Sequence, residues 1–502
     1  MIVSFHKKIQ QRNTFRVVFI TLAIVALCAV VSGCKKFLDV TPRDKVPQSI
    51  LLKDEQGFKD ALTGVYLGMD KPTTGGTFQG LYTSDLSMGM LATLGYDYDN
   101  ATTANAGANS NFFNSAVYYF YTDATMRAET DAAWMGMYNN IANLNNILEQ
   151  IDAKKSLFTA DNYNRIKGEA IGLRALFHFD LLRLFGQPPL TGMNSKAIPY
   201  ITSYGITSTP FSTLQNGLDS CISDLSAAKE LLSHTDTLSV LKATDDPFRS
   251  YTQNHMNYWA VQALMARVYL YKGDVTNADL YATVVINSNK FPLVSSNIAA
   301  AANPVRDRLF SQEHVFSIYS ANVKNYNSAL FNKSSGVPLL LTAAGKNRIY
   351  TTGSGSSSDY RYISWFDNSV GGSNVPSKFF QDANLPYSLQ NIVPVIRASE
   401  MYYIAAESVN SKGDIGQAVW YLNQVRQARG LAALNASGIA STDSLSKEIM
   451  KEYQKEFIQE GQTFFYYKRL NKDLKQVTAT TATIPADVYV LPIPDKEREY
   501  NH

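Results

Sequence analysis

The stretch ARVYLYKGDVTNADLYATVV, residues 266–285, is echoed by AESVNSKGDIGQAVWYLNQV at residues 406–425. The two stretches align at an offset of 140 residues, so that KGDV at 272–275 matches KGDI at 412–415. An alanine follows at the same place in both copies. A glycine in a tight turn with a small residue on the next helix lets two helices approach closely. The sequence therefore predicts two helical hairpins of one design.

Hairpins of this kind are typical of tetratricopeptide repeats. Two good copies predict helical-repeat packing, although a solenoid normally needs three or more repeats. Apolar residues at steps of three and four predict further helices. These helices cover residues 54–69, 128–151, 163–185, 211–232 and 255–271. We therefore expect a mostly α fold, in which 128–151 and 163–185 form an antiparallel pair.

Two long segments lack this periodicity. Residues 71–125 are rich in Gly, Thr, Asn and Ser with interleaved aromatic residues, and residues 289–392 combine loops with strand-like pieces such as HVFSIYS. Loops of such length in a compact domain tend to be functional. We expect irregular insertions there, followed by helix over 446–470 and an extended terminal strap over 488–501, where prolines fix the backbone.

The chain begins with an export signal. A basic flank precedes an apolar run of 15 residues, 17–31, which is shorter than the roughly 18 to 20 residues needed to span a bilayer. Small residues then precede Cys34, as in a bacterial lipoprotein processing site. We predict a signal peptide over 1–33, lipid on Cys34 and a tether over 34–48. An ordinary secretory signal with a coincidental cysteine, or a buried core helix, is the alternative.

Removal of the predicted leader changes the charge of the chain. The whole sequence has a formal net charge of +3, but residues 1–33 hold four basic and no acidic residues, which leaves 42 basic against 43 acidic residues. No basic field for nucleic acid remains. Of the three cysteines, Cys28 leaves with the leader and Cys34 is lipidated, so Cys221 has no partner for a disulfide and is expected in the core.

A screen for catalytic spacing finds little. The sequence has no HExxH, no Gly-x-Ser-x-Gly and no phosphate-binding loop, and we predict no catalytic residue, metal site or cofactor. A glycosidase needs only two acidic residues, so a pair of acids could be catalytic. The alternative for each pair is that its carboxylates are ion-paired or solvated. The pairs in question are Asp97 with Asp99 and Glu456 with Glu460; His178 with Asp180 falls on different helix faces.

Aromatic residues in the insertions are the better functional signal. The chain has 30 tyrosines, and tyrosine faces beside asparagine side chains suit the apolar faces and hydroxyl edges of sugars. For each residue, packing in the core is the alternative to ligand contact. The candidate ligand-binding residues are Tyr96, Tyr98, Asn100, Tyr319, Tyr326 and Tyr350.

Six stretches form an ordered series along the mature chain: SGCKKFLDVTP, YNNIANLNNILEQID, EAIGLRALFHFDLLRLFGQPPL, IRASEMYYIAAESVNSKGD, EFIQEGQTFFYYKRL and VLPIPDKEREYN. This series resembles the SusD/RagB-like nutrient-binding outer-membrane lipoproteins of Bacteroidetes. The resemblance implies a single domain over 34–502, built from about four tetratricopeptide-like helix pairs in a right-handed superhelix. Irregular insertions over 71–125 and 289–392 would carry the ligand platform.

The resemblance also implies a function. The protein would sit on the outer membrane, held by its lipid and facing the extracellular side. It would bind a nutrient and hand it to a SusC-like TonB-dependent transporter. A glycan or oligosaccharide is the first expectation for the ligand. A peptide ligand, a lipid-anchored glycoside hydrolase and a scaffold that binds only proteins are the alternatives. No ligand residue can be carried over from the family.

Most of the family-like stretches are expected to form scaffold. Glu169 and Arg174, or Glu407 and Arg426, could satisfy each other where helices pack. The family often has arginines around its Glu-Gly pair, whereas residues 459–463 here read QEGQT. The local ion pairs are therefore in doubt, although the fold is not.

Overall fold

A computed structural model describes the part of the chain in which the helical repeats lie. The described residues are 51–70, 80–105, 110–235, 242–350, 358–370, 372, 374–478 and 483–500. The predicted signal peptide, Cys34 and the tether lie outside them. The chain divides into two compact units, 1–57 and 58–502, and every site residue discussed below belongs to the second. Among the described residues, no helix is long and apolar enough to cross a membrane.

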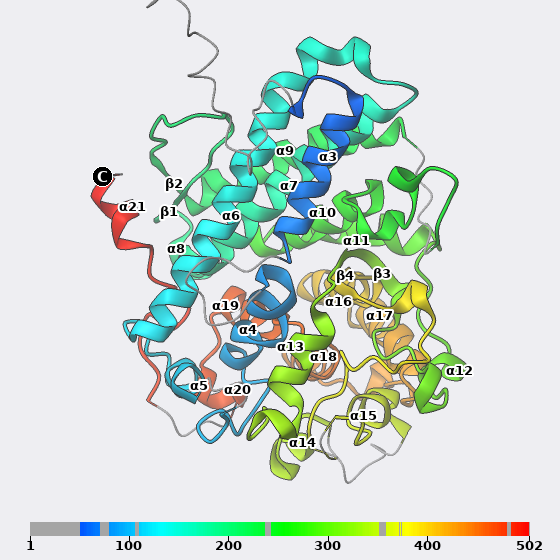
Figure 1. The fold of residues 1–502 in the computed structure, drawn as a ribbon. Coiled ribbons are helices and arrows are strands. Elements are labelled where there is room, and N and C mark those ends of the chain that lie inside the picture. Colours follow the sequence, from blue (N-terminus) through cyan, green and yellow to red (C-terminus); the bar gives the residue numbers. More distant parts are fainter. Residues whose placement is uncertain are drawn as a thin grey trace, which may run out of the picture. The chain divides into compact units, whose positions relative to one another are not determined.

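The long helices pack on one another in chain order (Figure 1). Each contacts the next, through α6 (Ala124–Ile151), α7 (Asn162–Phe185), α9 (Leu214–Ser233), α10 (Tyr258–Lys272), α11 (Val275–Asn287), α16 (Ala398–Ser411) and α17 (Ile415–Ala428). Because α16 packs on α11, the ladder of helices continues across the long segment inserted between them. The predicted mostly α class with tetratricopeptide-like helix pairs is confirmed.

The two KGD turns have the same geometry. Gly273 ends α10 with φ 87°, and Gly413 lies beyond α16 with φ 88°, the left-handed region that favours glycine. The aspartate after each glycine caps the next helix: Asp274 accepts from the amide of Asn277 at 3.0 Å, and Asp414 accepts from the amide of residue 417 at 2.9 Å. The repeat seen in the sequence is therefore a repeat of structure.

Two small antiparallel sheets brace the ladder. Strand β1 (Lys196–Pro199) pairs with β2 (Phe211–Thr213), and β3 (His314–Tyr319) pairs with β4 (Ile392–Arg397). In the second sheet Tyr319 lies opposite Ile392. Strand β4 leads directly into α16, and both β3 and β4 contact α10, so this sheet fastens the 289–392 insertion to the ladder.

Short helices complete the described structure. Before α6 come α3 (Glu55–Gly68), the π-helix η1 (Leu81–Met88), α4 (Met90–Leu94) and α5 (Ser110–Val117). The rest of the chain adds α8 (Pro189–Gly192), α12 (Ser296–Ala299), α13 (Val323–Phe331), α14 (Ala343–Tyr350), α15 (Tyr360–Trp365), α18 (Thr442–Glu456), α19 (Gln462–Arg469), α20 (Leu474–Thr478) and α21 (Asp495–Tyr500). Single 3₁₀ turns, including η4 (Pro247–Arg249), η5 (Thr252–Asn254), η7 (Ser311–Glu313) and η10 (Tyr387–Leu389), join them.

The expectation of one long loop over 71–125 is wrong for residues 81–94 and 110–117, which are helical. All eight residues of η1 and all five of α4 are buried, contacting neighbours on every side. A helix buried all round needs no polar face, so its sequence shows no amphipathic period. The Ser, Thr and Gly residues of this segment therefore suggested a loop in the sequence, although they lie in the core.

The C-terminal part of the chain also differs from the expected structure. The helix predicted over 446–470 is two helices, α18 and α19, because Gly461 and Gln459 take positive φ values of 68° and 65° between them. The strap over 488–501 is helical at its end, in α21, where Pro494 precedes the first turn.

The predicted ion pairs of the scaffold are wrong. Arg174 pairs with Asp224, at 2.7 Å, and not with Glu169. Glu407 pairs with Arg469, also at 2.7 Å. Arg426 pairs with Glu452, at 2.5 Å. The partners come from helices distant in sequence, α9, α18 and α19, because packing decides which charges meet.

A buried ionic cluster holds the later helices to the inserted region. Both Arg397, at the end of β4, and Arg429, after α17, donate to Glu456 of α18. Arg429 also pairs with Glu313 of η7 at 2.7 Å. Other members are Asp359, Arg361, Lys378, Glu452, Lys455 and Glu460. Glu460 keeps its ion pairs with Lys378 and Arg397, so the QEGQT segment retains a charged core despite its departure from the family pattern.

Candidate functional site

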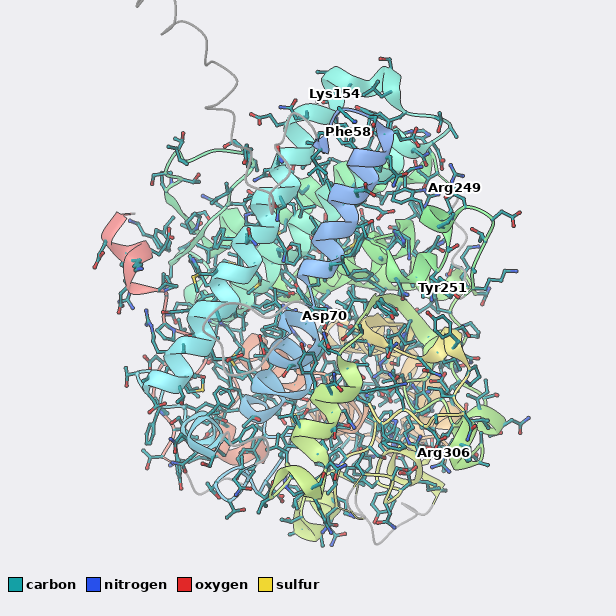
Figure 2. The ribbon with its side chains drawn as sticks, in the orientation of Figure 1. Phe58, Asp70, Lys154, Arg249, Tyr251 and Arg306 are labelled. Atoms are coloured by element: carbon teal, nitrogen blue, oxygen red, sulfur yellow. The ribbon has the colours of Figure 1, made fainter. Side chains whose placement is uncertain are left out.

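A cleft opens where helix α3 meets the ends of β3 and β4. Its volume is about 370 Å³, and its walls come from residues 63–67 of α3, residues 247–255, the end of β3 and residues 387–392. Figure 2 labels Arg249 and Tyr251 on the second of these walls. Arg249 is tied to Asp161 and to Asn162 at the start of α7, which anchors this loop to the ladder. We call this hollow the aromatic cleft.

Aromatic and apolar side chains give the cleft its shape. Tyr387 is 73% exposed and Tyr319 is 45% exposed, so both rings offer a face to solvent. Tyr251 has φ 52°, a left-handed conformation that is costly for a residue with a Cβ and that tends to occur at functional sites. The aromatic and apolar lining comprises Tyr66, Leu67, Phe248, Tyr251, Tyr319 and Tyr387, with Pro247 and Ile392 beside them.

A hydrogen-bonded trio holds one wall of the cleft. Oε2 of Glu169 accepts from the hydroxyl of Tyr66 at 2.6 Å and from Nδ1 of His255 at 3.0 Å. Burial, followed by the charge of Glu169, raises the pKa of the Tyr66 hydroxyl well above its usual range, so this hydroxyl stays protonated. Because Nδ1 of His255 faces the carboxylate, Nε2 is the ring nitrogen available to a ligand.

The polar lining of the cleft consists of Thr63, Ser250, Asn254, His255, Ser388 and Gln390. None of the lining residues is Asp, Glu, Lys or Arg. Asn254 accepts from Ser317 at 2.6 Å, and Gln390 accepts from Nζ of Lys324 at 2.9 Å. Gln390 also donates from Nε2 to the carbonyl of Leu385 at 2.6 Å, so both amides are held in place. The cleft thus combines exposed aromatic faces with fixed hydrogen-bonding groups and contains no Asp, Glu, Lys or Arg.

Three of the six sequence candidates are packed inside the fold. Tyr98 is fully buried and donates to the carbonyl of Met88 at 2.7 Å. Tyr350 is buried and donates to the carbonyl of Lys455 at 3.1 Å. Asn100 bonds the backbone of Pro338 and Leu340. Their polar groups serve the structure, as the packing alternative expected.

The other three candidates are more accessible, but only Tyr319 lines the cleft. Tyr96 is half-buried after α4, with φ 61°. Tyr326 is half-buried on α13, where its ring lies within 2.9 Å of the Cβ that a side chain at Gly80 would have. The structure does not bring Tyr96 or Tyr326 together with Tyr319.

The acidic pairs weighed for catalysis lie elsewhere and have structural partners. Glu456 and Glu460 belong to the buried ionic cluster. Asp97 accepts from the amide of Gln459 at 2.9 Å, and burial raises its pKa to about 7. Asp99 accepts from the amide of Thr342 at 2.6 Å.

His178 and Asp180 do not form a pair either. His178 lies between the carbonyl of Arg174 and the amide of Ile201, each at 2.9 Å. Asp180 accepts from the hydroxyl of Tyr82 at 2.5 Å. Among the described residues there is also no group of three or more His, Cys, Asp or Glu side chains placed to hold a metal ion.

Sequence reasoning missed most of the cleft. Tyr387 stands after a proline in LPYSLQN, within the segment expected to carry the ligand platform, and that local turn was the one signal that could have drawn attention to it. Tyr251 and Asn254 stand in the irregular stretch before α10. His255 was placed in the helix that follows, whereas α10 begins three residues later at Tyr258.

Comparison with known proteins agrees with the fold and with the ordered motifs. The family described as starch-binding and associating with the outer membrane matches residues 36–270, and the SusD family matches residues 375–483. The SusD-like protein P38 of Formosa agariphila is 22% identical over 518 residues, covering 91% of this chain and 92% of that protein.

Solved structures share the architecture. A SusD superfamily protein of Bacteroides fragilis has a TM-score of 0.67 at 21% identity, covering 90% of this chain and 99% of that one. A laminarin-binding SusD-like protein has a TM-score of 0.63 at 18% identity, covering 89% of this chain and 98% of that one. Since the family matches span both the early and the late helices of the ladder, the chain belongs to the SusD/RagB-like family.

Proposed function

We propose that the aromatic cleft binds a neutral glycan or oligosaccharide and that the protein delivers it to a SusC-like TonB-dependent transporter in the outer membrane. The observation that carries this proposal is the pairing of two exposed rings, Tyr319 and Tyr387, with a polar lining that contains no Asp, Glu, Lys or Arg. Sugar rings have apolar faces that stack on aromatic side chains, and their hydroxyl edges match amide and hydroxyl groups.

The charge of the cleft favours a sugar over the rival ligand, a peptide. A free peptide carries charged termini and often charged side chains, and the cleft lining offers no Asp, Glu, Lys or Arg to pair with them. Burying an unpaired charge is expensive, so a charged peptide end would bind poorly. Peptide binding is therefore the second candidate, and it predicts affinity for neutral, aromatic-rich sequences.

A lipid-anchored glycoside hydrolase finds less support. Such an enzyme needs two carboxyl groups on either side of the scissile bond, whereas the cleft lining contains no Asp or Glu. Glu169 is committed to Tyr66 and His255, and Asp246 accepts from the backbone amide of Phe248 at 2.9 Å. We therefore propose a binding role. A transporter must supply the energy for uptake, because binding alone only concentrates the ligand.

The proposal is tested by binding to polysaccharides and peptides. Full-length protein in detergent is titrated calorimetrically with laminarin, starch, uronic-acid polysaccharides and mixed peptides. We expect one neutral glycan to bind and Tyr387→Ala to weaken it at least about tenfold, the loss of a stacking contact worth about 1.4 kcal/mol. Tyr204→Ala is the matched control, because Tyr204 is 44% exposed and lies outside the cleft. Peptide binding without any glycan binding would overturn the sugar assignment.

The anchor and the partner need separate experiments. Cys34→Ala should release the protein from membranes without changing its circular dichroism, because acyl chains contribute about 0.8 kcal/mol per buried methylene. Copurification with a barrel transporter in mild detergent tests the delivery step. Membrane retention of the Cys34→Ala protein would mean that partner contacts, and not lipid, hold it there.

A further inference from the structure

The imidazole of His255 stands in the wall of the aromatic cleft with only one of its two nitrogens bonded. Nδ1 lies 3.0 Å from Oε2 of Glu169, whereas Nε2 makes no hydrogen bond with any residue that the structure describes. Nε2 is not buried either, because the side chain is 18% exposed and the buried polar atoms without a partner do not include it. Nε2 therefore keeps its whole hydrogen-bonding capacity for a ligand.

Glu169 determines which nitrogen of this ring carries the proton. Its side chain is fully buried, and its Oε2 accepts from the hydroxyl of Tyr66 at 2.6 Å as well as from His255. An ionised carboxylate only accepts hydrogen bonds, so Nδ1 carries the proton that points to it. In a neutral imidazole a proton on Nδ1 leaves Nε2 as an acceptor. The buried carboxylate thus sets the tautomer that faces the cleft.

Aromatic contacts hold the direction of the ring. The Tyr66 ring meets the imidazole edge-on with 5.3 Å between centroids, and the Phe248 ring does so at 5.9 Å. The Tyr66 hydroxyl is itself committed, since it donates to Glu169 and accepts from the amide of Met256 at 2.8 Å. Turning the imidazole over would break its bond to Glu169, so Nε2 is presented to the cleft in one direction.

The other polar side chains of the lining do not share this restriction. Three are bonded to carbonyl groups of the protein: Thr63 to Lys59 at 2.8 Å, Ser250 to Asp246 at 3.1 Å and Gln390 to Leu385 at 2.6 Å. The hydroxyl of Ser388 rotates and can both donate and accept, and the amide of Asn254 offers donors. Nε2 of His255 differs because a buried partner limits it to accepting.

We propose that His255 is a specificity-determining residue of the cleft and that Glu169 is its positioning residue. Nε2 accepts a hydrogen bond from a free hydroxyl of the sugar unit that lies in the cleft. A glycan with an ether, ester or sulfate in place of that hydroxyl has no donor there and leaves Nε2 unpaired, so it binds more weakly. This inference rests on the proposed function and narrows its ligand to glycans whose hydroxyl at that position is unsubstituted.

The test uses sugar analogues that differ at one hydroxyl. Full-length protein in detergent is titrated at pH 8, above the range in which an ordinary imidazole titrates, with a short oligosaccharide of the glycan that binds best. The same titration is made with its monodeoxyfluoro analogues. Fluorine cannot donate, so we expect an analogue that binds the unchanged protein about tenfold more weakly than the parent does. His255→Phe keeps a ring but no acceptor, so its affinities for the parent and that analogue should agree within about twofold.

Two substitutions of Glu169 separate the hydrogen bond from the charge. Glu169→Gln keeps an oxygen that accepts from Nδ1, so the preference for the hydroxyl over fluorine should remain. Glu169→Leu removes that acceptor and frees the tautomer, so the preference should fall to about twofold. Nitrogen-15 NMR of the His255 ring reads the tautomer directly. It should show the proton on Nδ1 in the unchanged and Glu169→Gln proteins only.

A control and the NMR measurement keep binding apart from folding. His234→Phe is the matched control, because His234 is 60% exposed and lies outside the cleft lining, and it should leave the preference unchanged. If either variant fails to fold, the other variant and the ring spectrum decide. A preference that survives His255→Phe, or a proton on Nε2 in the unchanged protein at pH 8, overturns the inference while the cleft stands. If no glycan binds the unchanged protein, the proposed function fails and this inference with it.

Discussion

Arg429 and Glu456 are joined by two hydrogen bonds in the core, from Nη2 to Oε1 at 2.6 Å and from Nε to Oε2 at 3.1 Å, and both side chains are fully buried. Burial alone would raise the pKa of Glu456, but the guanidinium groups of Arg429 and Arg397 hold it well below its usual range. The carboxylate is therefore ionised at neutral pH, and the cationic side chains around it depend on its charge.

Glu456→Gln should lower the free energy of unfolding by about 3–5 kcal/mol, because it leaves buried guanidinium groups without their counter-charge. Denaturant unfolding followed by circular dichroism measures the loss. Glu448→Gln on the same helix is the control, since its partner Lys451 is 49% exposed and such pairs contribute about 0–1 kcal/mol. Equal effects at the two positions would contradict a structural role for the buried cluster.

Replacing glycine with alanine should have opposite effects at the KGD turn before α17 and inside α17. Gly413→Ala should destabilise the protein by about 1 kcal/mol, because φ is 88° there although no atom lies within 4 Å of the added Cβ. Gly416→Ala, three residues later in α17, meets its nearest atom at 3.6 Å and should stabilise by about 0.5–1 kcal/mol. Thermal melts of the two variants check the signs, and a loss at both sites would point to packing and not to backbone conformation.

His178 makes stability depend on pH. Burial lowers the pKa of its imidazole from 6.5 to about 3. The native state therefore binds fewer protons than the unfolded chain between these values, and stability present above pH 6.5 is lost as the pH falls. At pH 5 the cost is about 2 kcal/mol, from about 1.36 kcal/mol per pH unit. Unfolding at pH 7 and pH 5, with NMR titration of the ring, tests this, and a His178 ring that titrates near 6.5 in the folded protein would refute it.

Two substitutions at Tyr251 distinguish the contribution of its ring to binding from the strain of its backbone. Tyr251→Ala and Tyr251→Gly both remove the aromatic face, so both should weaken glycan binding alike. The glycine variant should be more stable than the alanine variant by about 1 kcal/mol, because only glycine takes φ 52° without strain. The same two substitutions at Tyr204 supply the comparison. A difference in affinity between the Tyr251 variants would show that the loop conformation, and not the ring, governs binding.

The helical ladder could be predicted because its signals lie in residues close together in sequence. A turn such as KGD is fixed by residues adjacent in sequence, and the period of apolar residues marks a helix wherever one face is buried. The ion-pair predictions were wrong because the packing of the helices determines which charges meet. Glu407 of α16 pairs with Arg469 of α19, and Arg174 pairs with Asp224 of α9. Segment η1 was missed because a helix buried on all sides has no period to detect.

The cleft was harder to predict than the ladder. Tyr98 and Tyr387 both stand in loop-like sequence near Asn residues, yet one is fully buried and the other is 73% exposed. Burial of a tyrosine depends on which distant segments cover it, and no local pattern records that. Tyr319 was identified because it is one of the tyrosines in or beside the inserted segment 289–392.

The walls of the aromatic cleft come from residues 63–67, 247–255, 319 and 387–392, so more than three hundred residues separate the first wall from the last. No fragment shorter than this span contains the whole lining of the cleft. Occupancy of the cleft therefore reports that the helical ladder and its insertion have been joined correctly, and a ligand that bridges the walls holds them together against unfolding. A chain in which these segments are not brought together lacks the cleft even where its individual helices form.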